Sequence, residues 1–103
     1  MINFHQDVIV KLRDKHQVSQ KEVLECFANG EAAYFVDTSE EHQTDPPTHW
    51  FMAPTNHNRM LKVCFVRRNG DLQIKTAFEP KNDKHLELYR RLANLPSCWP
   101  LEE

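Results

Sequence analysis

Two lysines on a predicted β-hairpin are the residues of this chain best placed to bind an anion. The hairpin is indicated by the segment RMLKVCFVRRNGDLQIKTAFEP, residues 59–80, because Asn69-Gly70 is a strong signal for a two-residue turn. If these two residues form the loop, Lys75 faces Cys64, and Lys62 is its diagonal neighbour. Two ammonium groups this close usually lie in solvent. They also make an anion site, especially if further cations lie near, and the candidates are Arg59, Arg67 and Arg68.

The same register sorts the hairpin into two faces. The apolar face, which must be the core face, contains Leu61, Val63, Phe65, Leu72, Ile74 and Phe78. The opposite face contains Lys62, Cys64, Val66, Gln73, Lys75 and Ala77. A thiol in the middle of such a strand is normally inert, so Cys64 is not expected to be a nucleophile.

The six histidines raise the question of proton transfer or metal binding. His57, in the turn-like stretch TNHNRM, is a candidate general acid or base, although a lone loop histidine is often merely exposed. His42 and His49 are too far apart for the usual paired spacing on one helix face. The oxygen ligands nearest to them would be Asp37, Glu40, Glu41 and Asp45. A solvated polar loop has the same composition, so we predict no metal and no cofactor.

The stretch SEEHQTDPPTHW, residues 39–50, is predicted to connect two strands. Asp45 precedes Pro46-Pro47, and a proline restricts its predecessor to extended backbone. Long loops beside a sheet often carry function. We therefore expect partner recognition, if this loop has a role, through exposed residues of the loop and of the strand that follows: Glu41, His42, Asp45 and Trp50.

Composition places these residues in one soluble, cytoplasmic domain. The chain has 103 residues, of which 40% are hydrophobic and 27% charged, and its net charge is −2. No apolar run approaches the roughly 20 residues of a membrane helix, and the first residues do not read as a secretory signal. Three widely spaced cysteines suit reduced thiols. The slight acidic balance argues against a strongly basic nucleic-acid binder but permits a local basic patch.

The elements that position these residues follow from local patterns. Residues 6–16 read as a helix, and a second helix begins at Ser19, where Glu22 completes a capping box, and ends at Asn29-Gly30. Strands follow at residues 32–37 and 48–55, then the hairpin. A final helix, capped by Asn82 or Asp83, ends before Pro96. The predicted class is α+β, with two N-terminal helices, about four mainly antiparallel strands and a C-terminal helix in residues 1–96, and a tail at 97–103.

Two segments carry a resemblance to a known family. KLRDKHQVSQKEVLECFANG, residues 11–30, resembles the opening of BrnT-type toxins, and the hairpin of residues 59–80 with the charged helix containing Tyr89 resembles their last elements. The resemblance implies a RelE-like fold and a metal-independent endoribonuclease that acts on free or ribosome-bound RNA. It also implies an antitoxin partner that covers the active face. The implied phosphate-binding and proton-transfer residues are Lys62, Lys75, Arg59 and His57, with Glu79 as a base.

A second hypothesis is a binding module of the same fold without catalysis. The family usually has an arginine on the last strand where this chain has Phe78, and a glycine where it has Gln17. Such a module, a regulator or a phage or defence protein, would act through protein contacts. A basic groove on the surface would favour the ribonuclease, and an acidic or apolar patch the binding module.

Overall fold

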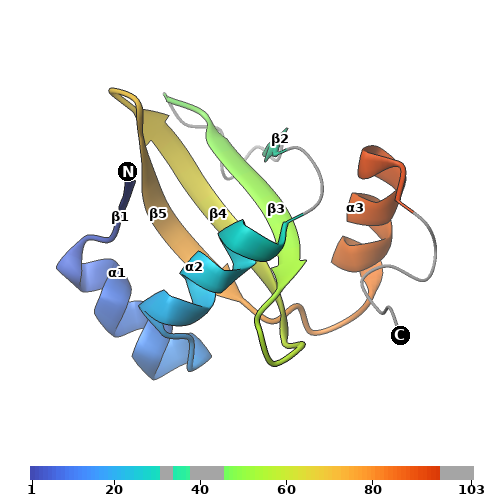
Figure 1. Cartoon of the computed structure of the whole chain (residues 1–103), viewed down its shortest axis with the longest axis horizontal. Helices are drawn as coiled ribbons and strands as arrows, with labels where there is room; N and C mark the ends of the chain where they lie inside the picture. The colour runs from blue at the N-terminus through green and yellow to red at the C-terminus, as the bar shows by residue number, and fades with distance from the viewer. Residues whose placement is uncertain (31–33, 38–45, 96–103) are drawn as a thin grey trace.

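The computed structural model describes residues 1–30, 34–37 and 46–95, and these form a five-stranded mixed sheet with helices (Figure 1). The strand order is β1-β5-β4-β3-β2. The strands are β1 (Ile2–Asn3), β2 (Phe35–Val36), β3 (Thr48–Pro54), β4 (Met60–Arg68) and β5 (Asp71–Phe78). β1 pairs with β5 in parallel, and all other pairs are antiparallel. The predicted α+β class is confirmed.

The helices of the described chain are α1 (Gln6–Lys11), a π-helical turn η1 (Leu12–His16), α2 (Gln20–Asn29) and α3 (Lys84–Ala93). At α2 the predicted capping box is present: the Ser19 hydroxyl accepts from the Glu22 amide, and the Glu22 carboxylate accepts from the Ser19 amide. At α3 the Asn82 side chain accepts from the Lys84 amide. None of these helices is long and apolar enough to cross a membrane.

Aromatic side chains pack on both faces of the sheet, because neighbouring residues of a strand point in opposite directions. On the α2 face, Phe27 packs against Phe51 and Phe65, with ring centroids 4.7 and 5.7 Å apart. On the α3 face, the buried Tyr89 ring lies 5.5 Å from both Phe35 and Trp50. The sheet is thus covered from two sides, and α3 is held by Tyr89.

The hairpin is confirmed at its turn and differs from the predicted register further on. Asn69 and Gly70 have φ values of 56° and 85°, and the predicted pairs Arg68–Asp71 and Phe65–Ile74 are present. Beyond that point Cys64 pairs with Thr76, not with Lys75, and Val63 pairs with Ala77. Lys75 is therefore the extra residue of a β-bulge.

Because of the bulge, the side chains of the last residues of β5 point to the faces of the sheet opposite to those predicted. Ala77 is fully buried opposite Val63 in the core, whereas Phe78, predicted for the core, pairs with Lys62 and points to the α3 face. The prediction was wrong here because an unpaired residue shifts the two-residue alternation by one. Lys75 itself remains exposed, as a charged side chain at a bulge requires.

Gln17 joins η1 to α2 in a left-handed conformation, with φ of 55°. This conformation strains any residue with a Cβ atom, and glycine adopts it without that cost. Gln17→Gly is therefore expected to raise the free energy of unfolding by about 0.5–1 kcal/mol, measured by chemical denaturation. Lys15→Gly, in the adjoining helical turn, is the control and should lower stability by a similar amount, about 1 kcal/mol. Equal destabilisation by both variants would contradict the prediction.

Candidate functional site

Lys62, on β4, lies at the centre of the candidate site. Its Nζ atom is 3.3 Å from Nδ1 of His85 on α3 and 4.8 Å from the centroid of the Trp50 ring on β3. A cation over the face of a tryptophan is stabilised by the ring's charge distribution. Two different elements therefore fix the ammonium group in one position.

The contact between Lys62 and His85 settles the protonation of the ring. An ammonium group can only donate hydrogen bonds, so Nδ1 of His85 accepts, and the proton of the neutral ring is on Nε2. Burial, together with the nearby charge of Lys62, lowers the pKa of His85 below its ordinary value. At neutral pH the pair therefore carries one positive charge, and the Nε2–H group is a further donor.

A hollow of about 540 Å³ opens beside this pair, between α3 and the β2–β3 edge of the sheet. Its polar groups are the Asp37 carboxylate, Lys62 and His85. The rest of the wall is apolar and consists of Phe35, Val36, Trp50, Leu88 and Leu92. A cation, a neutral donor and a carboxylate thus share one hollow with an apolar wall.

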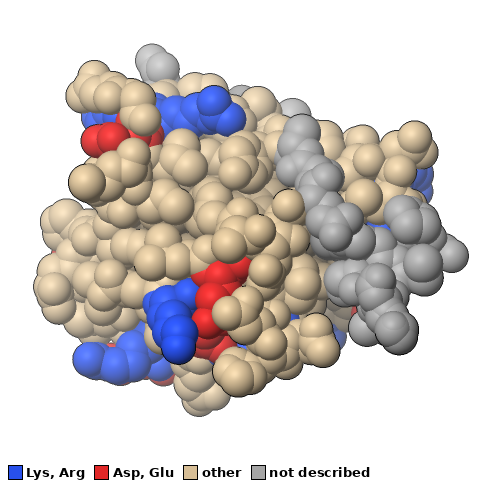
Figure 2. Space-filling model, in the orientation of Figure 1, with Lys and Arg blue, Asp and Glu red and all other residues tan. Residues whose placement is uncertain are grey.

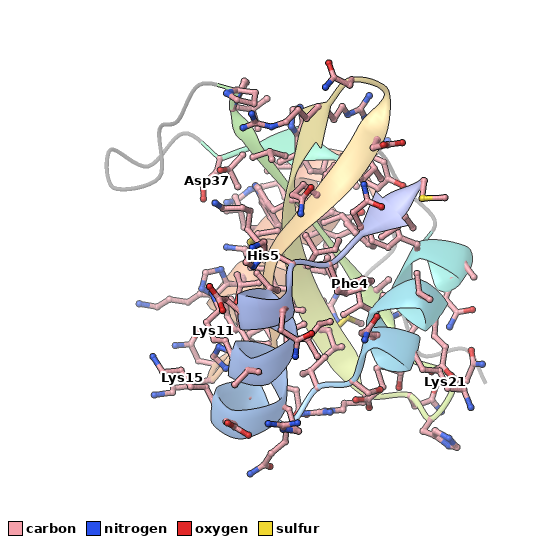
Figure 3. The ribbon with its side chains drawn as sticks, turned by 90° about the vertical axis from the view of Figure 1, so that its left-hand side faces the viewer. Phe4, His5, Lys11, Lys15, Lys21 and Asp37 are labelled. Carbon is pink, nitrogen blue, oxygen red and sulfur yellow. The ribbon has the colours of Figure 1, made fainter. Side chains whose placement is uncertain are left out.

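Further basic groups lie on the same side of the sheet. Lys11 and Lys15 point away from α2, on the side where Asp37 lies (Figure 3). Lys11 Nζ donates to the main-chain carbonyl of Lys75 at the bulge, 3.1 Å away. The Phe78 ring lies between two histidines, with centroids 5.7 Å from His16 and 6.5 Å from His85.

The Cys64 thiol is buried near Lys62 and Lys11 and is unreactive at neutral pH. Burial raises the pKa of this thiol to about 11, and the opposing effects of Lys62 and Lys11 are smaller. The Cys26 thiol, which donates to the Ala53 carbonyl, has its pKa raised to about 12, again by burial. Neither thiol is a thiolate at neutral pH, as expected for Cys64.

Arg59 and Glu79, both predicted as catalytic residues, are joined to each other in a different place. Arg59 Nε is 3.0 Å from Glu79, and Nη1 is 3.1 Å from both carboxylate oxygens of Glu22. The same guanidinium donates to the carbonyls of His16 and Gln17, at 3.0 and 2.7 Å. All of its nitrogens are engaged, so it ties η1, α2 and β5 together.

His57 and Lys75, which were also predicted for catalysis, do not line the hollow beside Lys62. His57 is exposed in the turn between β3 and β4, where its amide donates to the Thr55 hydroxyl. Lys75 is exposed at the bulge of β5. Of the five residues predicted for catalysis, the structure places Lys62 alone in the hollow.

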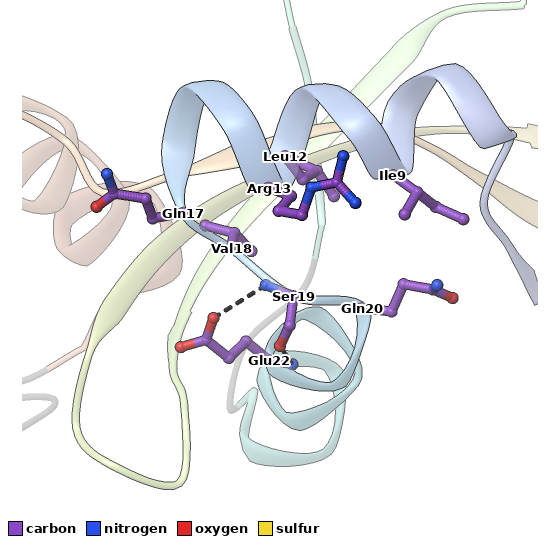
Figure 4. A pocket seen from close by; sticks show the side chains of 8 residues that line it. All are labelled: Ile9, Leu12, Arg13, Gln17, Val18, Ser19, Gln20 and Glu22. Atoms are coloured by element: carbon purple, nitrogen blue, oxygen red, sulfur yellow. Dashed lines mark hydrogen bonds between the residues drawn. The ribbon is translucent and has the colours of Figure 1, made fainter.

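A second hollow, of about 450 Å³, lies between η1 and the start of α2 (Figure 4). Its charged side chains already have partners: Glu22 bonds to Ser19 and Arg59, and Arg13 pairs with Asp14 at 3.0 Å. On the α2 face in general, basic and acidic side chains lie together in small groups (Figure 2). We therefore place the candidate site on the α3 face.

No family model, curated protein or solved structure matches this chain. The resemblance to BrnT-type toxins, and the antitoxin or RNA partners that it implies, stay predictions.

Of the four residues predicted for partner recognition, Trp50 alone lies among the described residues. Trp50 was expected to be exposed, and this was wrong: 6% of its surface is accessible, because Tyr89, Phe35 and Lys62 cover it. Glu41, His42 and Asp45 lie outside the described residues, as does the tail at 97–103.

His85 is the residue of the candidate site that sequence reasoning missed. It precedes the buried Tyr89 by four residues, so both side chains lie on the same face of α3. Leu86, Tyr89 and Ala93 recur at helical spacing in the sequence, which indicates the face of the helix that packs on the sheet; Leu92 has the same periodicity but is 50% exposed. A histidine one turn before such an anchor was the available signal.

Proposed function

We propose that this protein binds RNA on the α3 face of its sheet and cleaves it without a metal, as a toxin-like endoribonuclease. The observation that supports this most is the contact between the Lys62 ammonium group and the neutral His85 ring in a hollow that also contains the Asp37 carboxylate. Lys11 and Lys15, on the same side of the sheet, add charge for neighbouring phosphates.

The proposed reaction uses these groups in distinct roles. The Asp37 carboxylate takes the proton of an RNA 2′-hydroxyl, and the 2′-oxygen attacks the adjacent phosphorus. The Lys62 ammonium and the His85 Nε2–H donate to the phosphate oxygens, where negative charge develops. The bond from phosphorus to the 5′-oxygen breaks, and that oxygen takes a proton from Lys62. The products are a 2′,3′-cyclic phosphate and a free 5′-hydroxyl; Asp37 then loses its proton to solvent, and Lys62 takes one from solvent.

Cleavage of RNA by the purified protein, alone and with ribosomes, tests this mechanism. Lys62→Met, His85→Gln and Asp37→Asn are each expected to slow cleavage by about tenfold to a hundredfold, because each removes one donor or proton acceptor. Lys21→Met, at an exposed position on α2, is the matched control and should cleave like the wild type. Product analysis should find the 2′,3′-cyclic phosphate.

The rate of RNA cleavage is expected to fall at acidic pH, where His85 becomes protonated. The pKa of His85 is lowered below about 6.5, and its protonation replaces the Nδ1 acceptor by a second positive charge beside Lys62. The cleavage rate should therefore be unaffected by this group at neutral pH and should fall as the pH drops through the lowered pKa.

A preparation that cuts no RNA in either assay would refute the proposed function.

A second candidate function is a protein-binding module without catalysis. It is favoured by the engagement of Arg59 and Glu79 with each other and with Glu22, which leaves the predicted catalytic set dispersed. Co-expression with the product of the adjacent gene tests it. A stable complex, together with RNA left unchanged by the protein freed from that partner, would support the module over the ribonuclease.

A further inference from the structure

Exposed apolar side chains gather at the hollow beside Lys62. Among the described residues, large apolar side chains with high exposure are found at five positions, and three of them line this hollow: Val36, Leu88 and Leu92, at 48%, 37% and 50%. Leu88 and Leu92 are one turn apart on α3, and Phe35 faces them from β2; Val36 lines the hollow beside Phe35, but its pairing with His49 turns its side chain to the other face of the sheet. Exposed apolar side chains concentrated in one hollow indicate a binding site rather than ordinary surface.

The hollow has a polar part and an apolar part, which together suit a ligand with an anionic end and an apolar end. Lys62 and His85 supply donors for an anion at one part of the wall, and Phe35 adds an aromatic ring beside Leu88 and Leu92. The volume, about 540 Å³, is within the range of small-molecule sites, about 300–1,000 Å³. A nucleoside monophosphate has this combination of a compact anion and a flat ring with apolar faces.

We infer that this hollow is a nucleotide subsite: the phosphate lies on Lys62 and His85, and the nucleobase lies against Leu88, Leu92 and Phe35. The inference rests on the proposed function, because it names the part of an RNA strand that the hollow takes. The same chemistry is present in a free nucleoside monophosphate and in one nucleotide of a strand. Lys11 and Lys15 then contact phosphates of the strand outside the hollow.

Binding measurements with four probes test the subsite. They are adenosine 5′-monophosphate, adenosine, inorganic phosphate and a single-stranded ten-nucleotide RNA, each titrated into the full chain and followed by NMR or calorimetry. Adenosine monophosphate is expected to bind at least about tenfold more tightly than adenosine or phosphate, because only it engages both parts of the wall. The ten-nucleotide RNA should bind more tightly still if the natural source is a strand, and equally if it is the free nucleotide.

Three leucine variants separate the nucleobase contact from general effects. Leu88→Gln and Leu92→Gln should each weaken binding of adenosine monophosphate about fivefold and leave binding of phosphate unchanged. Leu24→Gln, at a similarly exposed leucine on α2, is the control and should change neither. Because all three leucines are already exposed, unchanged circular dichroism spectra and melting temperatures are expected.

The outcomes distinguish this inference from the proposed function. If RNA is cleaved but adenosine monophosphate binds no more tightly than phosphate, or the two α3 variants bind it normally, the subsite is overturned and the ribonuclease stands. If the monophosphate binds as expected and RNA stays intact, the subsite stands and the ribonuclease falls. Loss of binding to a protein partner in Leu88→Gln and Leu92→Gln, without any nucleotide binding, would assign the hollow to a protein instead.

Discussion

Replacement of Arg59 by methionine is expected to lower the free energy of unfolding by about 2–4 kcal/mol, which corresponds to a melting temperature lower by about 10–25 °C. The guanidinium is partly buried, with 22% of the side chain exposed, and it bonds to two carboxylates and two carbonyls. Methionine preserves the apolar stem but removes every donor. Chemical denaturation measures the loss.

The size of this effect follows from what Arg59 joins. The carbonyls of His16 and Gln17 lie at the end of η1, where helical carbonyls lack partners within the helix. Glu22 lies in the first turn of α2, and Glu79 directly follows β5. Removing the arginine leaves two neighbouring carboxylates and two carbonyls without their cation, which costs more than the net strength of the bonds themselves.

The exposed arginine of η1 provides the control. Arg13 pairs with Asp14 at 3.0 Å, but the two side chains are 69% and 59% exposed, and such pairs contribute little. Arg13→Met should therefore leave the unfolding curve unchanged. If the two arginine variants were equally stable, the proposed role of Arg59 in holding three elements together would be disproved.

The same network predicts an acid-dependent loss of stability. Burial opposes ionisation of the Glu22 carboxyl, but the hydrogen bond from the Ser19 amide and the Arg59 guanidinium outweigh it and lower the pKa of Glu22. A lowered carboxyl pKa adds stability that is present above the unfolded value, about 4.3, and is lost as the pH falls through the folded value. In Arg59→Met this loss at low pH should be smaller than in the wild type.

Local signals in the sequence predicted the elements, because their causes lie within a few residues. The capping box of Ser19 and Glu22 and the turn at Asn69-Gly70 are both present as expected. The strand β1 was not anticipated, since two residues are too few to show an alternating pattern. It forms because β5 offers an edge, and that edge exists only after the sheet has assembled.

Residues that act across the sheet were harder to predict, because their neighbours depend on register and on packing. The bulge at Lys75 moved Phe78 to the α3 face, and no residue type in β5 marks it. Lys62 was identified from its strand face alone, but its contact with His85 depends on how α3 docks. Arg59 looked like a phosphate ligand in the sequence, and its ion pairs with Glu22 and Glu79 join residues up to 37 positions apart.

Tyr89→Ala is the second substitution with a large expected effect, a loss of about 3–5 kcal/mol in the free energy of unfolding. The side chain is fully buried, and its ring packs against Trp50 and Phe35, each 5.5 Å away. Burial raises the pKa of its hydroxyl to about 12, and a main-chain hydrogen bond with Met52 opposes this rise. Truncation leaves a cavity between α3 and the sheet.

Because Tyr89 is the fully buried side chain of α3, its loss should also displace the half-buried His85 from Lys62. Tyr89→Phe separates packing from the hydroxyl: it keeps the ring and should cost about 1 kcal/mol, with nucleotide binding retained. Under conditions where Tyr89→Ala is still folded by circular dichroism, it should lose adenosine monophosphate binding while Leu24→Gln retains it. Normal binding by folded Tyr89→Ala would mean that α3 does not need this anchor to position His85, and that the hollow is held by other contacts.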